Sequence, residues 1–255
     1  IPNTNTPLDG VLTTLTDVLK PVLDVVGPIN GSVAYENVIH YIGNLRHVPS
    51  ANLYSGADEL VQVNQAIALA QTLDQTGVPY RFYLHPVSEH LTFIALDDWR
   101  KESEASADWV RVKNPRRITY RFDPRFDYPE YAVKHDRAYW LSQLVSRDGL
   151  EAEVELVANG CGGNEVTYTA GQDAGPSPLP WVGLNRVKSG QEPVAAASTL
   201  SGSLRNVAAG LIEASAICLG SGTLSYDIIS DGTALLRLSS GKVIRLIAGH
   251  NQDAI

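Results

Sequence analysis

An acidic residue and a histidine, each placed shortly after an apolar run, are the residues of this sequence best suited to proton-transfer chemistry. Asp58 follows the run that begins at Leu53, and His90 follows the run at 80–84. Imidazole ionises near neutral pH, and a buried carboxylate that accepts a hydrogen bond from one ring nitrogen leaves the other nitrogen as the base. The two residues are therefore predicted to be catalytic, Asp58 as the orienting acid and His90 as the general base.

The residues between them predict one strand–helix–strand unit. Gly77 is a typical C-terminal stop for a helix, and Pro79 precedes the second apolar run. When two parallel strands are joined by a helical crossover, their carboxyl ends lie at the same edge of the sheet. Asp58 and His90 would meet at that edge. The helix is indicated by apolar residues at helical spacing: Val63, Ala66, Ile67, Ala70 and Leu73.

Both assignments have alternatives. Asp58 could cap the helix that follows it by accepting hydrogen bonds from backbone N–H groups, and Glu59 is an alternative acid. His90 could be a polar surface histidine. His85 is only five residues away, but it belongs to the strand run before Pro86, whereas His90 occupies a loop before an expected helix at 91–99. The loop position favours His90.

Two short motifs carry a resemblance to a known family. Gly56-Ala-Asp58-Glu-Leu-Val61 and Glu89-His90-Leu-Thr resemble the acid and histidine loops of α/β-hydrolase serine enzymes of the prolyl-oligopeptidase and esterase kind. The sequence is most similar to secreted actinobacterial hydrolases in which a β-rich domain follows the histidine loop, and the likeness continues through 136–142, 204–207 and 230–232. The resemblance implies that Asp58 is the triad acid, that His90 is the triad base and that the protein is secreted.

The serine nucleophile of that family is missing from these residues. It belongs to a Gly-x-Ser-x-Gly motif upstream of the acid, and none of Ser32, Ser50 and Ser55 lies between glycines with that spacing. Residues 220–222, Gly-Ser-Gly, lack the leading glycine and follow His90. We therefore expect an N-terminal hydrolase segment or a separate chain to supply the serine and the oxyanion donors. The absence of methionine at the start of the sequence favours proteolytic processing.

The predicted fold class is α/β followed by all-β. Residues 1–108 are expected to be the C-terminal portion of an α/β-hydrolase fold, with an amphipathic helix at 7–26 that is either a lid or a helix packed on the sheet. Residues 109–255 are expected to form an antiparallel β-sandwich, because short alternating apolar runs are separated by turn residues. The expected strands lie at 110–122, 136–145, 151–157, 165–169, 211–217, 224–229, 235–238 and 243–247.

Composition limits the classes of partner. The formal net charge of −8 and the lack of a basic cluster disfavour nucleic acid and anionic membrane surfaces. The sequence contains no run of about 18 apolar residues, so no membrane span is predicted. Cys161 and Cys218 are expected either to form one disulfide or to be two buried thiols. No zinc spacing is present and no cofactor is required, and the loop carboxylates that could hold calcium lack regular spacing: Asp123, Asp127, Asp136 and Asp148.

The sequence thus predicts a serine hydrolase that acts on ester or peptide bonds. The apolar face of the expected helix at 7–26 slightly favours an acyl or polyester substrate. The alternative is a non-catalytic binding or assembly module derived from a hydrolase.

Overall fold

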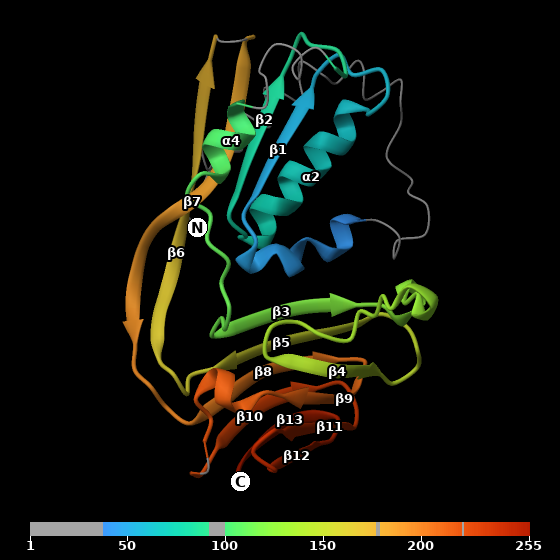
Figure 1. Cartoon of the computed structure of the whole chain (residues 1–255), viewed down its shortest axis with the longest axis vertical. Coiled ribbons are helices and arrows are strands. Elements are labelled where there is room, and N and C mark those ends of the chain that lie inside the picture. The colour runs from blue at the N-terminus through green and yellow to red at the C-terminus, as the bar shows by residue number, and fades with distance from the viewer. Residues whose placement is uncertain (1–37, 92–99, 177–178, 221) are drawn as a thin grey trace, which may run out of the picture. The chain divides into compact units, whose positions relative to one another are not determined.

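The computed structural model describes residues 38–91, 100–176, 179–220 and 222–255 and divides the chain into two compact units (Figure 1). The first unit holds the described residues up to Arg111 together with Thr167–Gly190. The second holds Val112–Val166 and Gln191–Ile255. The chain therefore enters the second unit near residue 112, returns once to the first as part of a long hairpin, and then completes the second. The predicted division into 1–108 and 109–255 did not include this return.

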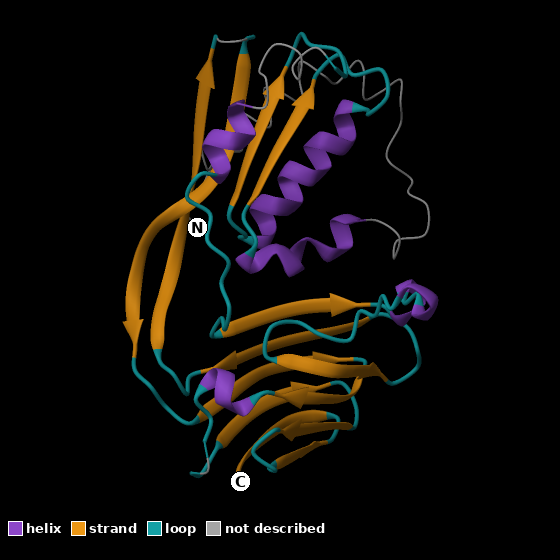
Figure 2. Cartoon of the chain, viewed as in Figure 1, coloured by secondary structure: helices purple, strands orange, loops and turns teal. Residues whose placement is uncertain are grey.

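The first unit is built on a four-stranded sheet with the order β1-β2-β7-β6. Strands β1 (Ser50–Ser55) and β2 (Tyr80–His85) are parallel, and β7 (Trp181–Val194) pairs with β2 in the antiparallel direction. The edge strand β6 (Gly163–Gly175) forms the hairpin with β7, and the far ends of both strands belong to the second unit. Figure 2 shows these strands and the helices beside them.

Helix α2 (Val63–Thr76) connects β1 to β2, as the apolar spacing predicted. All five apolar residues that indicated this helix are buried, and they pack with β2 in one core. Gly77 ends the helix in the left-handed conformation, with φ of 69°, where its N–H donates to the carbonyl of Asp74. The unit also contains the 3₁₀ helix η2 (Val38–His47) and the short helix α4 (Arg100–Ser106). The expected helices at 7–26 and 91–99 lie outside or almost wholly outside the described residues.

The second unit contains two sheets that share one hydrophobic core. One sheet has the order β13-β10-β8-β5-β3, and the other has the order β12-β11-β9-β4. Short 3₁₀ helices η3 (Pro124–Phe126), η4 (Pro129–Tyr131) and η5 (Ala214–Ile217) lie in the connections. The strands are β3 (Arg117–Phe122), β4 (Leu141–Ser146), β5 (Ala152–Ala158), β8 (Thr199–Arg205), β9 (Val207–Ile212), β10 (Ser225–Ser230), β11 (Ala234–Leu238), β12 (Val243–Leu246) and β13 (Gly249–Ala254).

The predicted fold class, an α/β-hydrolase portion followed by an antiparallel sandwich, is wrong. The described residues are mostly β-sheet, and among those of the first unit only β1 and β2 form a parallel pair of the α/β kind, next to an antiparallel β7. In the second unit β8 is parallel to β10, and β9 is parallel to β11, so these sheets are mixed. The alternation of apolar and polar residues gives the period of a strand but not the direction of its partner, and for this reason the pattern could not show the mixed pairing.

The two cysteines form a disulfide within the second unit. Cys161 lies in the turn after β5, and Cys218 is the left-handed C-cap of η5. The two segments approach closely at Gly160, because a β-carbon there would lie 2.2 Å from the carbonyl oxygen of Ile217. Of the two states expected for the cysteines, the structure contains the bonded one.

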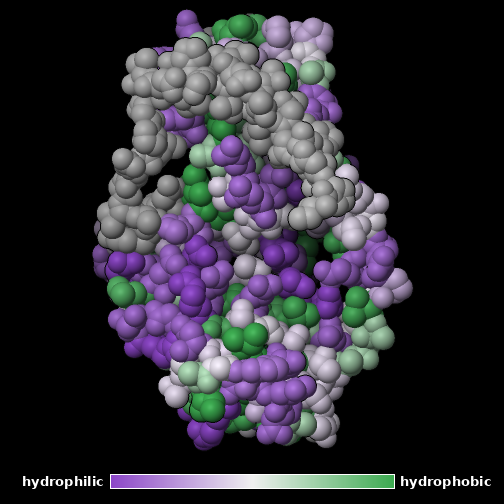
Figure 3. Space-filling view, turned by 180° about the vertical axis from the view of Figure 1, so that it is seen from behind, coloured by the Kyte–Doolittle hydropathy of each residue, from purple (hydrophilic) through white to green (hydrophobic). Residues whose placement is uncertain are grey.

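Trp140 and Trp181 are both buried. Trp140 is 2% exposed, and its ring N–H donates to the carbonyl of Pro115 at 2.7 Å. Trp181 packs edge-on against Tyr83, and the ammonium of Lys101 lies 3.9 Å from its ring centroid. Some large hydrophobic residues remain exposed. On the face shown in Figure 3, the hydrophobic residues (green) form small separate groups.

Replacement of Gly202 by alanine is expected to destabilise the second unit by about 2–4 kcal/mol. Gly202 lies in the middle of β8 with φ of +145°, and a β-carbon there would be 1.9 Å from the carbonyl oxygen of Glu155. The free energy of unfolding in urea, followed by circular dichroism, measures the effect. Gly222→Ala is the control, since no atom of a described residue other than its chain neighbours lies within 4 Å of its β-carbon position. If the two substitutions changed the free energy of unfolding equally, β8 and β5 could separate enough to accommodate the added β-carbon without loss of stability.

Candidate functional site

The candidate site lies just beyond the carboxyl ends of β1 and β2. These parallel strands end opposite each other, with Ser55 paired to His85. The loops that follow are joined by backbone hydrogen bonds, from the N–H of Gly56 to the carbonyl of His85 at 2.8 Å and from the N–H of Ala57 to the carbonyl of Ser88 at 3.0 Å. The sheet therefore delivers residues 58 and 90, which are distant in sequence, to one place.

Glycine at position 56 permits this close approach of the two loops. A β-carbon on Gly56 would lie 2.4 Å from the carbonyl oxygen of Pro86 and 2.8 Å from its α-carbon. Both atoms belong to the backbone, so a side chain here could be accommodated only if the loops separated. Glycine at position 56 is thus a structural requirement for bringing the acid next to the histidine loop.

The side chains of Asp58 and His90 are hydrogen-bonded to each other. Nδ1 of His90 lies 2.8 Å from Oδ2 of Asp58 and 3.0 Å from Oδ1. The Asp58 side chain is 5% exposed, while that of His90 is 33% exposed. The imidazole therefore directs one nitrogen to a nearly buried carboxylate and still reaches solvent. Within the described residues, its ring forms no hydrogen bond other than the one to Asp58, so Nε2 is left available to a further group.

The carboxylate of Asp58 is held in place by its own loop. Oδ1 accepts from the backbone N–H groups of Leu60 at 2.8 Å and Val61 at 2.7 Å. Burial disfavours the charged form, but the hydrogen bonds from Val61, His90 and Leu60 favour it more strongly, and the pKa of Asp58 lies below its ordinary value. Helix α2 begins only at Val63. Asp58 therefore fixes the loop before the helix and does not cap the helix itself.

The two alternative residues lie elsewhere. His85 is fully buried within β2, and it contributes its carbonyl to the loop contacts described above. Glu59 is exposed, and its Oε2 lies 3.5 Å from the backbone N–H of His90, too long for a strong hydrogen bond. Between the two loops, the buried hydroxyl of Ser88 donates to that of Ser55 at 2.9 Å. This link between the loops was missed, since nothing in the sequence pattern marks two serines 33 residues apart as partners.

Two further histidine–aspartate pairs in the second unit were also missed. His135 lies 3.2 Å from Asp127, and His250 lies 2.6 Å from Asp227. Their carboxylate side chains are 20% and 51% exposed, compared with 5% for Asp58. A carboxylate in water orients an imidazole less firmly than a buried one does. Of the three pairs, the one at Asp58 is the best suited to proton transfer.

A metal-binding group is not found in the described parts of the chain, where no three His, Cys, Asp or Glu residues are arranged to hold an ion. The loop aspartates that were considered for calcium have protein partners. Asp123 pairs with Arg125, and Asp148 accepts a hydrogen bond from the side chain of Asn206. The hydrogen bonds and the charge of Arg125 lower the pKa of Asp123 below its ordinary value in spite of burial.

The depressed pKa of Asp58 predicts a specific sensitivity to acid. Because its pKa is lower in the folded than in the unfolded chain, the carboxylate contributes stability above the unfolded pKa, and this stability is lost as the pH falls through the folded pKa. The free energy of unfolding, measured by urea titration from neutral to acidic pH, is expected to fall more steeply in the wild type than in Asp58→Asn. Parallel pH profiles of the two proteins would contradict this expectation.

Comparison with known proteins gives no relative: no family model, no curated protein and no solved structure matches the chain. The resemblance to hydrolases therefore stays a prediction from short motifs. The described residues form no helix long and apolar enough to cross a membrane. The disulfide is compatible with an extracellular protein.

Proposed function

We propose that the protein is part of a serine hydrolase in which Asp58 and His90 are the acid and the base of the catalytic triad. The observation that carries this proposal is the 2.8 Å contact between Nδ1 of His90 and the nearly buried carboxylate of Asp58. A carboxylate in this position keeps the proton on Nδ1, so that Nε2 is the basic nitrogen. The proposal concerns this pair and the chemistry it supports, not an α/β-hydrolase fold.

The proposed reaction requires a serine from outside this set of residues, on an upstream segment or a separate chain. Nε2 of His90 takes the proton of the serine hydroxyl as its oxygen attacks an ester or amide carbonyl. The same proton then passes to the leaving alcohol or amine as the acyl bond breaks. Nε2 of His90 then takes a proton from a water molecule, whose oxygen attacks the acyl-serine. The proton returns to the serine oxygen as the acid product leaves, and Asp58 stabilises the imidazolium in each step.

The side chains around the pair favour a substrate with an apolar acyl part. Leu60, Val87 and Leu91 belong to the two loops that carry Asp58 and His90, and these residues are 70%, 69% and 64% exposed. Aliphatic groups held in water near a polar pair can contact an apolar ligand. Ester hydrolysis is therefore proposed ahead of peptide hydrolysis, and the rates on short p-nitrophenyl esters and on alanine or proline anilides compare the two.

Fluorophosphonate labelling tests the proposed function. The protein is isolated from its native source with any chain that co-purifies, and intact-mass measurement identifies the chain that carries the serine. We expect one serine to be labelled, and we expect labelling to be lost in His90→Ala. If the variant labels at the wild-type rate, or if no serine in the preparation reacts, the pair serves only to join the two loops.

The alternative function is a binding or assembly module derived from a hydrolase. The sequence observation that favours it is the absence of a Gly-x-Ser-x-Gly motif from these residues. The two functions differ in the effect of His90→Ala, which would leave partner binding by the second unit unchanged but would abolish catalysis. We further propose secretion, supported by the disulfide within the second unit.

A further inference from the structure

The outer face of the five-stranded sheet in the second unit has two different halves. On β3 and β5, and at Arg205 at the end of β8, the outward side chains are long and paired with one another. Arg117 contacts Glu155 at 2.9 Å, and Glu153 is shared by Arg121 at 3.1 Å and Arg205 at 3.0 Å. These residues cover their half of the sheet with ion pairs and leave few groups free to bind a ligand.

The other half of the face contains a hollow of about 470 Å³ across β8, β10 and β13. The strand register explains its position, because Ser201 lies opposite Asp227, and Asp227 lies opposite Gln252. Ser225 is flanked in the same way by Thr199 and Ala254. Most of these side chains are short, so they leave room above the sheet. We call this feature the strand hollow. Nine residues line it, and those that the register places on the outer side of the sheet are Thr199, Ser201, Ser225, Asp227, Gln252 and Ala254.

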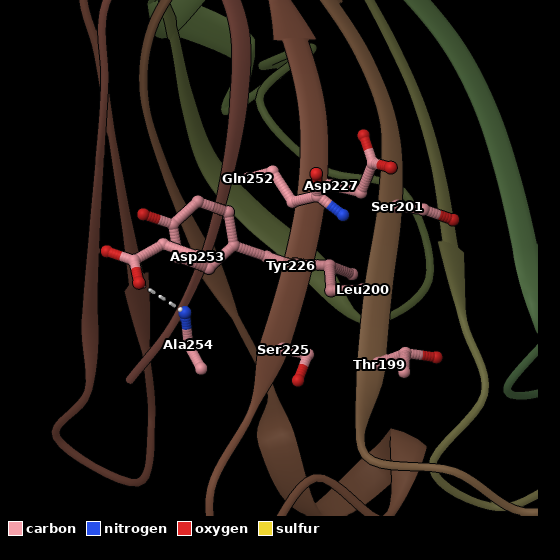
Figure 4. Close-up of a pocket in the computed structure, with 9 residues that line it drawn as sticks. All are labelled: Thr199, Leu200, Ser201, Ser225, Tyr226, Asp227, Gln252, Asp253 and Ala254. Carbon is pink, nitrogen blue, oxygen red and sulfur yellow. Dashed lines mark hydrogen bonds between the residues drawn. The ribbon is translucent and has the colours of Figure 1, made fainter.

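The alternation of side chains along the strands separates this set from its neighbours. Figure 4 shows the side chains of Asp227, Ser201 and Gln252 on one side of the strands and those of Tyr226, Asp253 and Leu200 on the other. Leu200 is fully buried, and Tyr226 packs against the core of the unit. The side chains of Leu200 and Tyr226 therefore point away from those of Ser201 and Asp227.

The polar groups of the strand hollow are largely unused by the protein. The side chains of Ser201, Ser225 and Gln252 form no hydrogen bond with any described residue. Thr199 accepts one hydrogen bond, from the side chain of Asn159 at 3.0 Å. Asp227 is bonded through Oδ1 to Nε2 of His250 at 2.6 Å, which holds the carboxylate in place and leaves Oδ2 as an acceptor. Donors and acceptors thus alternate over three strands that together span about 10 Å.

The charges of this surface exclude several classes of ligand. Among the described residues that line the hollow there is no lysine or arginine, so phosphate, nucleic acid and acidic sugars lack a counter-charge. Asp227 and Asp253 are the carboxylates among the described residues that line it. The side chain of Asp253 points to the other side of the strands, and Asp227 already has a histidine partner, which disfavours a cation. Hydroxyl, amide and carboxylate groups in a row match a neutral ligand that itself carries several hydroxyl groups.

We propose that the strand hollow binds a neutral saccharide. Asp227 and Gln252 form hydrogen bonds with neighbouring hydroxyl groups of one sugar residue. Ser201 and Ser225 form hydrogen bonds with the next sugar residue, and Ala254 leaves space for the ring of that residue. This binding site belongs to the second unit alone and does not depend on the proposed hydrolase. It would attach the protein to a polysaccharide surface.

Nuclear magnetic resonance titration of the complete chain with cellobiose, maltose and N,N′-diacetylchitobiose tests the proposal. At least one of these disaccharides is expected to shift the backbone amide signals of Ser201, Asp227 and Gln252 in a saturable way. Asp227→Ala should weaken its binding at least about tenfold, because a hydrogen bond to a charged group is lost. Asp253→Ala is the matched control, since it removes a carboxylate whose side chain points to the other side of the strands, and it should leave the affinity within about twofold.

Three results would overturn the proposal. The first is that none of the three disaccharides binds. The second is that Asp227→Ala and Asp253→Ala weaken binding equally while both variants unfold at the wild-type temperature. The third is that putrescine or inorganic phosphate shifts the same amide signals and the disaccharides do not. His90→Ala should not alter saccharide binding, so failure of this proposal is distinguishable from failure of the hydrolase proposal.

Discussion

Asp58→Asn is expected to reduce kcat/KM for a p-nitrophenyl ester by about 10⁴-fold in a preparation that contains the serine. Asparagine has the size of aspartate, and its oxygen can still accept from the N–H groups of Leu60 and Val61. The loss is therefore expected without a large change in the loop. The amide N–H of asparagine would donate to Nδ1 of His90, so that Nδ1 must be the nitrogen without a proton. The ring proton then lies on Nε2, which can no longer act as the base.

Glu59→Gln is the matched control for this experiment. It changes a carboxylate to an amide at the neighbouring position, where the side chain is exposed and only 3.5 Å from the backbone N–H of His90. Its kcat/KM is expected to equal that of the wild type. A similar loss of kcat/KM in both variants would mean that the negative charge of the loop supports the reaction. It would contradict a specific role of Asp58 in orienting the imidazole.

Removal of the disulfide is expected to cause the largest loss of stability. Cys161 and Cys218 are separated by 57 residues, and opening a loop of that length raises the entropy of the unfolded chain by an amount worth about 4 kcal/mol. Double replacement by serine should lower the free energy of unfolding of the second unit by about this amount. Urea titrations followed by tryptophan fluorescence measure it, and Trp140 in the core of that unit reports the transition.

The reductant dithiothreitol provides the control for the disulfide prediction. It should lower the stability of the wild type to that of the double variant and should leave the variant unchanged. A loss of less than about 1 kcal/mol would show that the unfolded chain is already compact between these two positions.

The strand–helix–strand segment could be predicted from the sequence because its signals are local. Helical spacing of five apolar residues, a glycine stop and a following apolar run describe α2 and β2 without reference to the rest of the chain. The same local signal indicated β5, β10, β11 and β12 within one or two residues.

The larger errors concern pairing between distant segments. Residues 181–194 were not predicted as a strand, yet β7 lies against β2 and gives the first sheet its antiparallel neighbour. Residues 211–217 were expected to be one strand, but β9 ends at Ile212 and η5 follows. Strand direction and partner depend on which buried faces meet in the folded protein, and a periodic pattern does not contain that information.

The candidate site was predictable in its residue types and less so in its supports. A carboxylate and an imidazole at the ends of consecutive apolar runs identified Asp58 and His90. The backbone donors of Leu60 and Val61 and the contact between the loops at Gly56 depend on loop geometry, which short motifs do not specify. The strand hollow likewise depends on the register of β8, β10 and β13 and has no sequence motif.

The central claim is that the carboxylate of Asp58 fixes the proton of His90 on Nδ1 and leaves Nε2 as the base. The most direct measurement is the ¹⁵N nuclear magnetic resonance spectrum of the His90 ring in the wild type and in Asp58→Asn, at a pH where the ring is neutral. The account predicts a protonated Nδ1 in the wild type and a shift of the proton to Nε2 in the variant. A proton on Nε2 in the wild type, or the same tautomer in both proteins, would contradict it.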